Sequence, residues 1–166
     1  MIEHVILVDE KDKQVGIGEK LETHRQAKLH RAFSILVYNS KGEMMLQLRA
    51  KTKYHGGGLW TNACCGHPRP SETVEQAAHR RLKEEMGFDC PLTKSFDYIY
   101  KVPLDKGMSE HEFLHVYKGI YDGVPKLNPE EADDWKWISM KELREDMKNN
   151  PQSYTPWFKL SMEKIK

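Results

Sequence analysis

Two reactive side chains lie close together in the stretch from Trp60 to Pro68. This stretch reads W-T-N-A-C-C-G-H-P, and it separates Cys65 from His67 by one residue. A cysteine side chain can exist as thiol or thiolate near neutral pH and can therefore donate or accept a proton. A cysteine and a histidine can also form a nucleophile and base pair, although this spacing does not by itself supply the required geometry. Acid–base chemistry and a cysteine–histidine hydrolase are the two interpretations of this pair.

A helix is predicted from residue 72 to residue 86, capped by Ser71 at its start and by Gly87 at its end. Arg81 and Glu85, four residues apart, fall near the middle of the side that should be apolar. The other residues on that side are Val74, Ala77, Ala78 and Leu82. Two charges in this position are costly to bury unless each finds a partner. A surface ion pair on a helix whose buried face is shifted towards Leu82 and Met86 is the structural alternative.

Glu110 and Glu112 are two residues apart in a segment predicted to be extended. Their carboxylates then project from the same face of the strand and can meet one ion. Histidine nitrogens together with carboxylate oxygens suit zinc, manganese or, less naturally, magnesium. A lone histidine is more often a core or surface residue, so each of the eight histidines needs further support before it is counted as a ligand.

Length and charge limit the kinds of protein this can be. The chain has 166 residues, enough to bury a continuous core as one domain over residues 1–166. With 26 basic and 25 acidic residues the net charge is +1, which predicts no attraction to nucleic acid or to an anionic membrane. The three cysteines include an adjacent pair that rarely satisfies disulfide geometry, which predicts a reduced, cytoplasmic setting. Acidic residues near the start argue against a signal peptide, and no apolar run reaches membrane-spanning length.

Strand and helix signals alternate along the chain. Residues 31–38 and 43–49 are strand-like runs joined by Asn39-Ser40-Lys41-Gly42, which predicts a hairpin. Further strands are predicted over residues 96–102 and 112–121, and helix starts at Ser139 and at Thr155-Pro156. This order indicates an α+β or α/β sandwich.

The predicted helix lies inside a longer pattern. Against the Nudix box G-x5-E-x7-R-E-U-x-E-E-x-G-U, where U is a bulky apolar residue, one position differs: Arg81 replaces a glutamate. The positions that match are Gly66, Glu72, Arg80, Leu82, Glu84, Glu85, Gly87 and Phe88. The change removes a metal-binding carboxylate and adds a cation that favours phosphate. Without that glutamate, we do not assign Glu72 or Glu84 to a metal.

Together with Cys65 in T-N-x-x-C-G-H-P, the chain resembles the type I isopentenyl diphosphate isomerases, a branch of the Nudix superfamily. The resemblance covers nearly the whole chain in the same order. The other residues on which the resemblance rests are His24, His30, Arg49, Lys53, Tyr100, Glu110-His111-Glu112 and Pro156-Trp157. It implies a Nudix-like mixed sheet between helices, and an enzyme that interconverts isopentenyl diphosphate and dimethylallyl diphosphate through a tertiary carbocation.

The resemblance also implies two metal positions. One divalent ion, Mn²⁺, Zn²⁺ or Mg²⁺, would be held by a set of five side chains: His24, His30, His67, Glu110 and Glu112. Glu85 would help to hold a Mg²⁺ ion that arrives with the substrate diphosphate. The remaining histidines, among them His55, match no ligand position and are taken as structural.

Roles for the other site residues follow from the same resemblance. Cys65 would act on one face of the substrate, and Glu112 with its partner Tyr100 on the opposite face. The ring of Trp157 would stabilise the carbocation, a contact of roughly 2 kcal/mol or more when desolvated. The diphosphate would be bound by three cations, Arg49, Lys53 and Arg81.

The remaining expectations concern neighbouring residues and alternatives. Cys64 and Cys90 are interpreted as buried apolar residues, and the acidic residues of 130–134 as a solvated face without a role. Gly56-Gly57-Gly58 indicates a mobile or closely approached backbone. The expected partner is a small isoprenoid diphosphate, with no nucleic acid or membrane, and the expected state is a monomer or weak homodimer. A Nudix pyrophosphohydrolase is the alternative enzyme, and a diphosphate-binding module without catalysis is the non-enzymatic one.

Overall fold

The structure is a computed structural model that describes residues 2–53 and 55–165. The N-terminal part forms strands β1 (His4–Val8) and β2 (Gln14–Glu19), helix α1 (Lys20–Arg25), and strands β3 (His30–Tyr38) and β4 (Met44–Arg49). Strands β5 (Trp60–Asn62) and β6 (Cys64–Gly66), helix α2 (Val74–Met86), and strands β7 (Thr93–Pro103) and β8 (Ser109–Ile120) follow. Strand β9 (Ala132–Ile138), helix α3 (Met140–Asn149), the 3-10 turn η1 (Pro151–Ser153) and helix α4 (Pro156–Lys164) complete the described chain.

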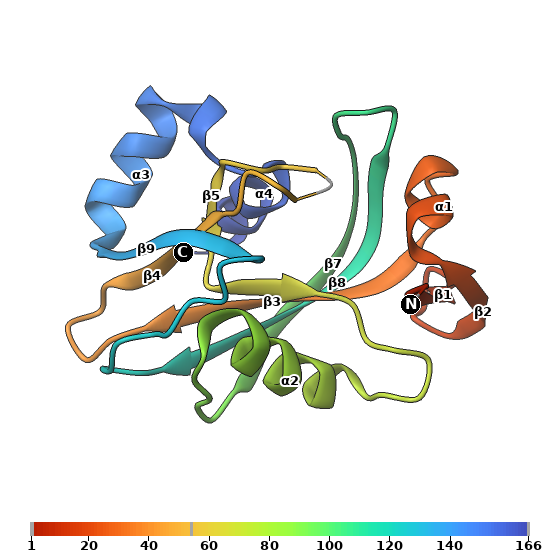
Figure 1. The fold of residues 1–166 in the computed structure, drawn as a ribbon, viewed down its shortest axis with the longest axis horizontal. Helices are drawn as coiled ribbons and strands as arrows, with labels where there is room; N and C mark the ends of the chain where they lie inside the picture. The colour runs from red at the N-terminus through yellow and green to blue at the C-terminus, as the bar shows by residue number, and fades with distance from the viewer. Residues whose placement is uncertain (1, 54, 166) are drawn as a thin grey trace.

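Strand β3 lies at the centre of a mixed sheet (Figure 1). It pairs in parallel with β8 over its whole length, from His30 opposite Glu112 to Tyr38 opposite Ile120. It also pairs antiparallel with β6, which carries Cys65. Strand β7 adds to the far edge of β8, and β4 pairs with β5 and β9. The central strand therefore brings the cysteine segment and the acidic segment to the same part of the sheet.

The two faces of the sheet are covered by different helices. Alternate residues of β3 point to opposite faces: Phe33, Ile35 and Val37 pack with α2, and Ala32 and Leu36 pack with the C-terminal helices. Figure 1 shows α2 on one side of the sheet, with α3 and α4 on the other. The predicted sandwich of a mixed sheet between helices is confirmed.

The predicted hairpin is wrong in one respect. The turn forms, with Asn39 N–H donating to the Glu43 carbonyl at 2.9 Å and Gly42 at a φ of 79°. However, β3 and β4 are paired at Tyr38 and Met44 and then separate. Beyond that pair, β6 occupies this edge of β3 and β5 occupies this edge of β4, so the ladder between the two strands does not continue.

Helix α2 begins at a different cap from the predicted one. Thr73, not Ser71, is the N-cap, because its hydroxyl accepts from Gln76 N–H at 3.1 Å and the Gln76 side chain accepts in return from Thr73 N–H at 3.0 Å. The predicted end is confirmed, since Gly87 adopts a φ of 69° in the left-handed region. Ser139 caps α3 as predicted. Thr155 occupies the N-cap position of α4, but its hydroxyl donates to Thr61.

Candidate active site

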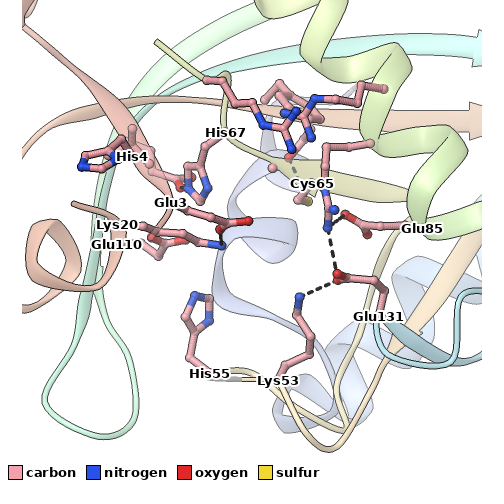
Figure 2. A pocket seen from close by; sticks show the side chains of 18 of the residues that line it. Glu3, His4, Lys20, Lys53, His55, Cys65, His67, Glu85, Glu110 and Glu131 are labelled. Atoms are coloured by element: carbon pink, nitrogen blue, oxygen red, sulfur yellow. Dashed lines mark hydrogen bonds and ion pairs between the residues drawn. The ribbon is translucent and has the colours of Figure 1, made fainter. Parts of the chain in front are cut away.

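One cavity of about 450 Å³ is lined by several of the residues predicted to act on the substrate (Figure 2). Cys65 on β6 and Glu112 on β8 both line it. So does Trp157, at the start of α4 on the other side of the sheet from α2. Strands β6 and β8 flank β3, so sheet pairing rather than proximity in the sequence puts the thiol and the carboxylate in one cavity.

The five predicted metal ligands converge. Their ligand atoms all lie within 4.8 Å of one another. They come from α1 (His24), the first residue of β3 (His30), the loop after β6 (His67) and β8 (Glu110 and Glu112). Glu110 and Glu112 project from the same face of β8 as predicted, and the register of β3 and β8 sets His30 directly beside Glu112.

Distances within the cluster suit one shared ion. His67 Nε2 lies 2.9 Å from Glu112 Oε2, and His30 Nε2 lies 3.4 Å from the same oxygen. His24 Nε2 contacts Glu110 Oε1. Two ligand atoms that each bind one ion at about 2.1 Å are about 3.0 to 3.5 Å apart. The donor set therefore fits a divalent cation.

Backbone carbonyls orient two of the imidazoles. His24 Nδ1 lies 2.6 Å from the Lys20 carbonyl, and His30 Nδ1 lies 2.9 Å from the Lys28 carbonyl. A carbonyl can only accept, so each Nδ1 carries the proton and each Nε2 presents a lone pair to the cluster. This is the tautomer that binding of a metal ion through Nε2 requires.

The two carboxylates of the cluster have pKa values shifted in opposite directions. Burial, reinforced by the nearby charge of Glu112, raises the pKa of Glu110 to about 7. Burial opposes ionisation of Glu112 as well, but contacts from His30 and His67 outweigh it and hold the pKa of Glu112 well below its usual value. Burial lowers the pKa of His67 to about 3, so its imidazole is neutral. A neutral imidazole beside an ionised carboxylate is suited to cation binding.

Cys65 is held by two polar side chains. Its Sγ donates to Asn62 Oδ1 at 3.2 Å and lies 3.3 Å from Ser34 Oγ. Asn62 is fixed in turn by donating to the Ile35 and Cys64 carbonyls, both at 2.9 Å. Burial raises the pKa of the Cys65 thiol to about 11. In the resting site the sulfur therefore carries its proton.

Trp157 is packed between the side chains of Arg49 and His55. The guanidinium carbon of Arg49 lies 5.1 Å from the ring centroid of Trp157, within range of a cation–π contact. The His55 ring meets Trp157 edge-on, with 5.5 Å between centroids. Arg49 Nη2 also donates to the His55 carbonyl at 2.9 Å. These contacts fix the indole at the cavity wall.

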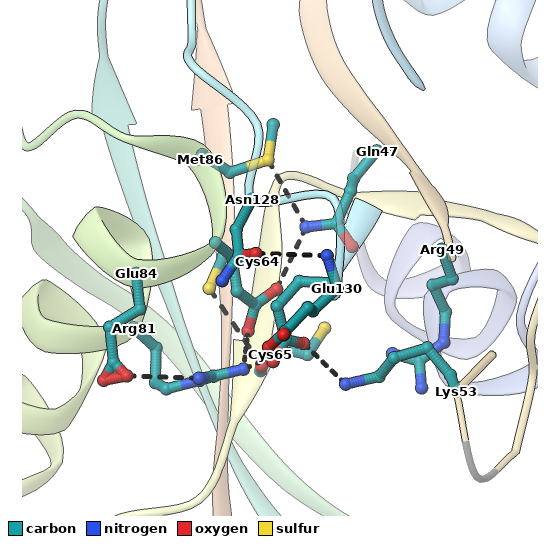
Figure 3. A network of polar contacts seen from close by, with 12 residues as sticks. Gln47, Arg49, Lys53, Cys64, Cys65, Arg81, Glu84, Met86, Asn128 and Glu130 are labelled. Carbon is teal, nitrogen blue, oxygen red and sulfur yellow. Dashed lines mark hydrogen bonds and ion pairs between the residues drawn. The ribbon is translucent and has the colours of Figure 1, made fainter. Parts of the chain in front are cut away.

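The predicted cations face the same cavity, and two of them already have acidic partners. Arg81 Nη2 donates to Glu85 Oε2 at 2.7 Å, which confirms that each buried charge on α2 has a partner. Glu85 also accepts from Gln47 at 3.0 Å. Arg81 and Lys53 both contact Glu131. Figure 3 shows Gln47, Lys53 and Arg81 of this network around Cys65.

The prediction of a purely solvated acidic run is wrong for Glu131. Glu130, Asp133 and Asp134 are exposed as expected, but Glu131 is half-buried and lines the cavity. His55, predicted to be structural, is 2% exposed, lines the cavity and lies near His24 with 5.7 Å between ring centroids. No motif marks either residue. Their positions result from the β4–β9 pairing and from the loop after β4.

Other residues lie where the sequence analysis put them. Glu72 and Glu84 of the box pair with Arg80, which agrees with leaving them out of the metal site.

Cys64 and Cys90 are buried, and all three cysteines are free. The glycine-rich segment is closely approached, because a Cβ on Gly57 would lie 2.8 Å from the Lys51 carbonyl oxygen. Among the described helices, none combines the length and apolarity that crossing a bilayer requires.

Comparison with known proteins identifies the domain first. The NUDIX domain model matches residues 28–158. The fold resembles a crystal structure of a protein from Deinococcus radiodurans, with a TM-score of 0.75 and 20% identity over 89% of this chain and 90% of that one. It also resembles the MutT protein of Methanosarcina mazei, with a TM-score of 0.65 and 20% identity over 82% and 91% of the two chains. The fold is that of a NUDIX domain.

Relatives with higher sequence identity show the family to which the chain belongs. The chain is 50% identical to isopentenyl-diphosphate Delta-isomerase 2 of Aromatoleum aromaticum, covering 99% of this chain and 87% of that protein. It is 48% identical to isopentenyl-diphosphate Delta-isomerase of Pectobacterium atrosepticum, covering 97% and 90%. The protein of the same kind from Photorhabdus laumondii is 50% identical, with 96% and 90% covered. The chain therefore belongs to the isopentenyl-diphosphate Delta-isomerases that carry a NUDIX domain.

Proposed function

We propose that this enzyme interconverts isopentenyl diphosphate and dimethylallyl diphosphate. The observation that carries the proposal is that Cys65 and Glu112 line the same cavity. The Tyr100 hydroxyl donates to Glu112 Oε1 at 2.5 Å. An isolated double bond needs a proton donor at one carbon and a base at another. A thiol and a carboxylate in the wall of one cavity supply both.

The reaction is a balanced proton relocation. One proton adds to the terminal methylene carbon of isopentenyl diphosphate, and the electron pair of the double bond forms the new C–H bond. The positive charge then lies on the tertiary carbon. A second proton leaves the methylene carbon between the tertiary carbon and the carbon that bears the diphosphate, and its bonding pair forms the new double bond. In the reverse reaction the donor and the acceptor exchange roles.

Cys65 and Glu112 perform these transfers from opposite faces of the substrate in our proposal. The high pKa of the Cys65 thiol, about 11, keeps a proton on sulfur in the resting site. Glu112 exchanges its proton on the other face, with Tyr100 as its hydrogen-bond partner. Trp157 stabilises the tertiary cation through its ring face, a contact that exists only once the charge develops and that therefore favours the transition state.

The diphosphate is bound by Arg49, Lys53 and Arg81, which lie on the cavity wall. Arginine grips phosphate oxygens in a fork, whereas lysine acts as a point charge. Glu85 helps to hold the Mg²⁺ that accompanies the diphosphate. Binding of the anionic end positions the five-carbon end between Cys65 and Glu112.

The histidine and glutamate cluster holds one divalent ion, Mn²⁺, Zn²⁺ or Mg²⁺, in our proposal. When bound, such an ion offsets the charge of the two buried carboxylates and tunes the acidity of Glu112. The ligands are His24, His30, His67, Glu110 and Glu112. We also propose that the enzyme works in the cytoplasm as a single-domain monomer or weak homodimer; its free cysteines agree with a reduced setting.

The alternative of a Nudix pyrophosphohydrolase is disfavoured by Arg81. This cation stands where such an enzyme carries a glutamate, and it is ion-paired with Glu85. A binding module without catalysis would not need the Cys65, Tyr100 and Glu112 arrangement.

The decisive experiment measures deuterium incorporation into isopentenyl diphosphate in deuterated water with Mg²⁺. We expect exchange and isomerisation with the wild type, and near-complete loss of both with Cys65→Ala and with Glu112→Gln, with the fold retained by circular dichroism. Wild-type rates in either variant would refute the role of that residue. Phosphate release from a nucleoside diphosphate derivative, without isomerisation, would favour the hydrolase instead.

A further inference from the structure

One carboxylate oxygen bridges two of the cations assigned to the diphosphate. Glu131 Oε2 lies 2.6 Å from Lys53 Nζ and 3.2 Å from Arg81 Nη2 (Figure 2). All three side chains line the cavity and are 15% to 20% exposed. A single oxygen shared by a lysine and an arginine is also the contact that a phosphate oxygen makes at such a site.

The backbone around Glu131 fixes this carboxylate in place. Glu131 N–H donates to the Asn128 carbonyl at 2.9 Å, and the Glu131 carbonyl accepts from Ala50 N–H at 3.0 Å. The second bond joins the segment before β9 to the residue that follows Arg49. The acidic side chain is therefore attached to the same loop that carries Lys53.

Electrostatics explain why a carboxylate is useful here. Lys53 and Arg81 are like charges held close together in a partly buried wall, and each would repel the other without an anion between them. Burial favours the neutral form of Glu131, but Lys53 and Arg81 outweigh it and lower its pKa. The carboxylate is thus charged at neutral pH and keeps the two cations at a common point.

We propose that Glu131 is a positioning residue of the anion site, whose carboxylate holds Lys53 and Arg81 in place and is displaced when a diphosphate oxygen takes its position. The inference rests on the proposed function for the identity of the anion. The two cations are arranged before the substrate arrives, at the cost of some affinity, because two ion pairs must be exchanged for the new ones.

A different role for Glu131 is also testable. Arg81 Nη2 contacts both Glu85 and Glu131, so the two carboxylates share one nitrogen as a partner. If Glu131 were a second ligand for Mg²⁺ beside Glu85, its loss would weaken binding that depends on magnesium. If the diphosphate instead displaces the Glu131 carboxylate, loss of this carboxylate should strengthen anion binding.

The test is calorimetric titration of inorganic pyrophosphate into wild type and Glu131→Gln, with and without Mg²⁺. We expect Glu131→Gln to bind pyrophosphate about three- to tenfold more tightly without Mg²⁺, since two partly exposed ion pairs no longer compete. The KM for isopentenyl diphosphate should fall with it. Glu130→Gln is the matched control, because Glu130 is the exposed neighbour and its loss should leave the dissociation constant unchanged.

Several outcomes would overturn the proposal. These are unchanged or weaker binding in Glu131→Gln, an equal shift in Glu130→Gln, or a loss confined to the magnesium titration. A merely structural ion pair would lower thermal stability without tightening pyrophosphate binding. If Glu131→Gln fails to fold, Glu131→Asp is the second variant, because it keeps the charge on a shorter side chain. Glu131→Asp should bind pyrophosphate more tightly than wild type, by a smaller factor than expected for Glu131→Gln. Equal or weaker binding contradicts the proposal. Pyrophosphate binding needs no turnover, so its failure leaves the isomerase assignment standing, and the reverse also holds.

Discussion

Tyr100 and Glu112 are directly opposite each other in the β7–β8 ladder, and the phenol hydroxyl donates to Glu112 Oε1 at 2.5 Å. Burial raises the pKa of Tyr100 well above its usual value, so the phenol keeps its proton and acts as a donor. The pairing of two strands thus delivers a hydrogen bond to one oxygen of the carboxylate, while His67 contacts the other oxygen at 2.9 Å.

Removal of this hydroxyl should affect turnover far more than stability. We expect Tyr100→Phe to lower kcat by about 100-fold or more, because Glu112 loses the partner that orients it and shares its proton. The measurement is steady-state kinetics with isopentenyl diphosphate, alongside metal content. Tyr98→Phe is the matched control: Tyr98 lies two residues earlier on β7 and its hydroxyl bonds Ser161 at 2.7 Å instead. Equal loss in both variants would contradict a specific role for Tyr100.

The metal cluster should respond to loss of a single ligand. We expect His24→Ala to weaken divalent-metal binding at least about tenfold, since even groups behind the ligands change affinity by about 10- to 100-fold. Because an ion that binds the folded state stabilises it, chelation should lower the melting temperature of wild type more than that of His24→Ala. Elemental analysis and thermal unfolding with and without chelator measure both effects.

His79→Ala provides the control for that experiment. His79 contacts Asp89 at the surface and lies outside the cluster, so its loss should leave the metal content unchanged. A normal metal content in His24→Ala would exclude this histidine from the ligand set.

The corrected start of α2 makes a prediction about stability. Thr73→Ala should reduce the free energy of unfolding by about 1 kcal/mol, because it removes the hydroxyl that accepts from Gln76 N–H. Ser71→Ala should change it by less than about 0.5 kcal/mol, as Ser71 is exposed and does not cap the helix. Urea unfolding of both variants gives the comparison, and a larger loss in Ser71→Ala would restore the cap predicted from sequence.

Local spacing was enough to predict two pairs of side chains in the candidate site. Arg81 and Glu85 are four residues apart on a helix, and they form the ion pair that this spacing allows. Glu110 and Glu112 are two apart on a strand, and they reach the same cluster. Such pairs are fixed by the repeat of one element, so the sequence alone predicts them.

Features that depend on the rest of the fold were harder to predict than these local pairs. Thr73 and Ser71 are both acceptable caps by residue type, and the path of the chain into α2 decided between them. The hairpin between β3 and β4 formed its turn but only one pair of its ladder, because β6 and β5 occupy the edges of β3 and β4 that a longer ladder would use.

The sequence by itself determined the class of fold, because the order of its motifs along nearly the whole chain resembles that of a known family. The same resemblance named the candidate metal ligands and the residues proposed for proton transfer. The tertiary structure decided that Glu131 contacts Lys53 and Arg81, and that His55 packs against Trp157. Those contacts join segments far apart in the chain, or depend on the path of a loop, and no local periodicity encodes them. The register of the sheet is the physical reason that the thiol of Cys65 and the carboxylate of Glu112 share one cavity.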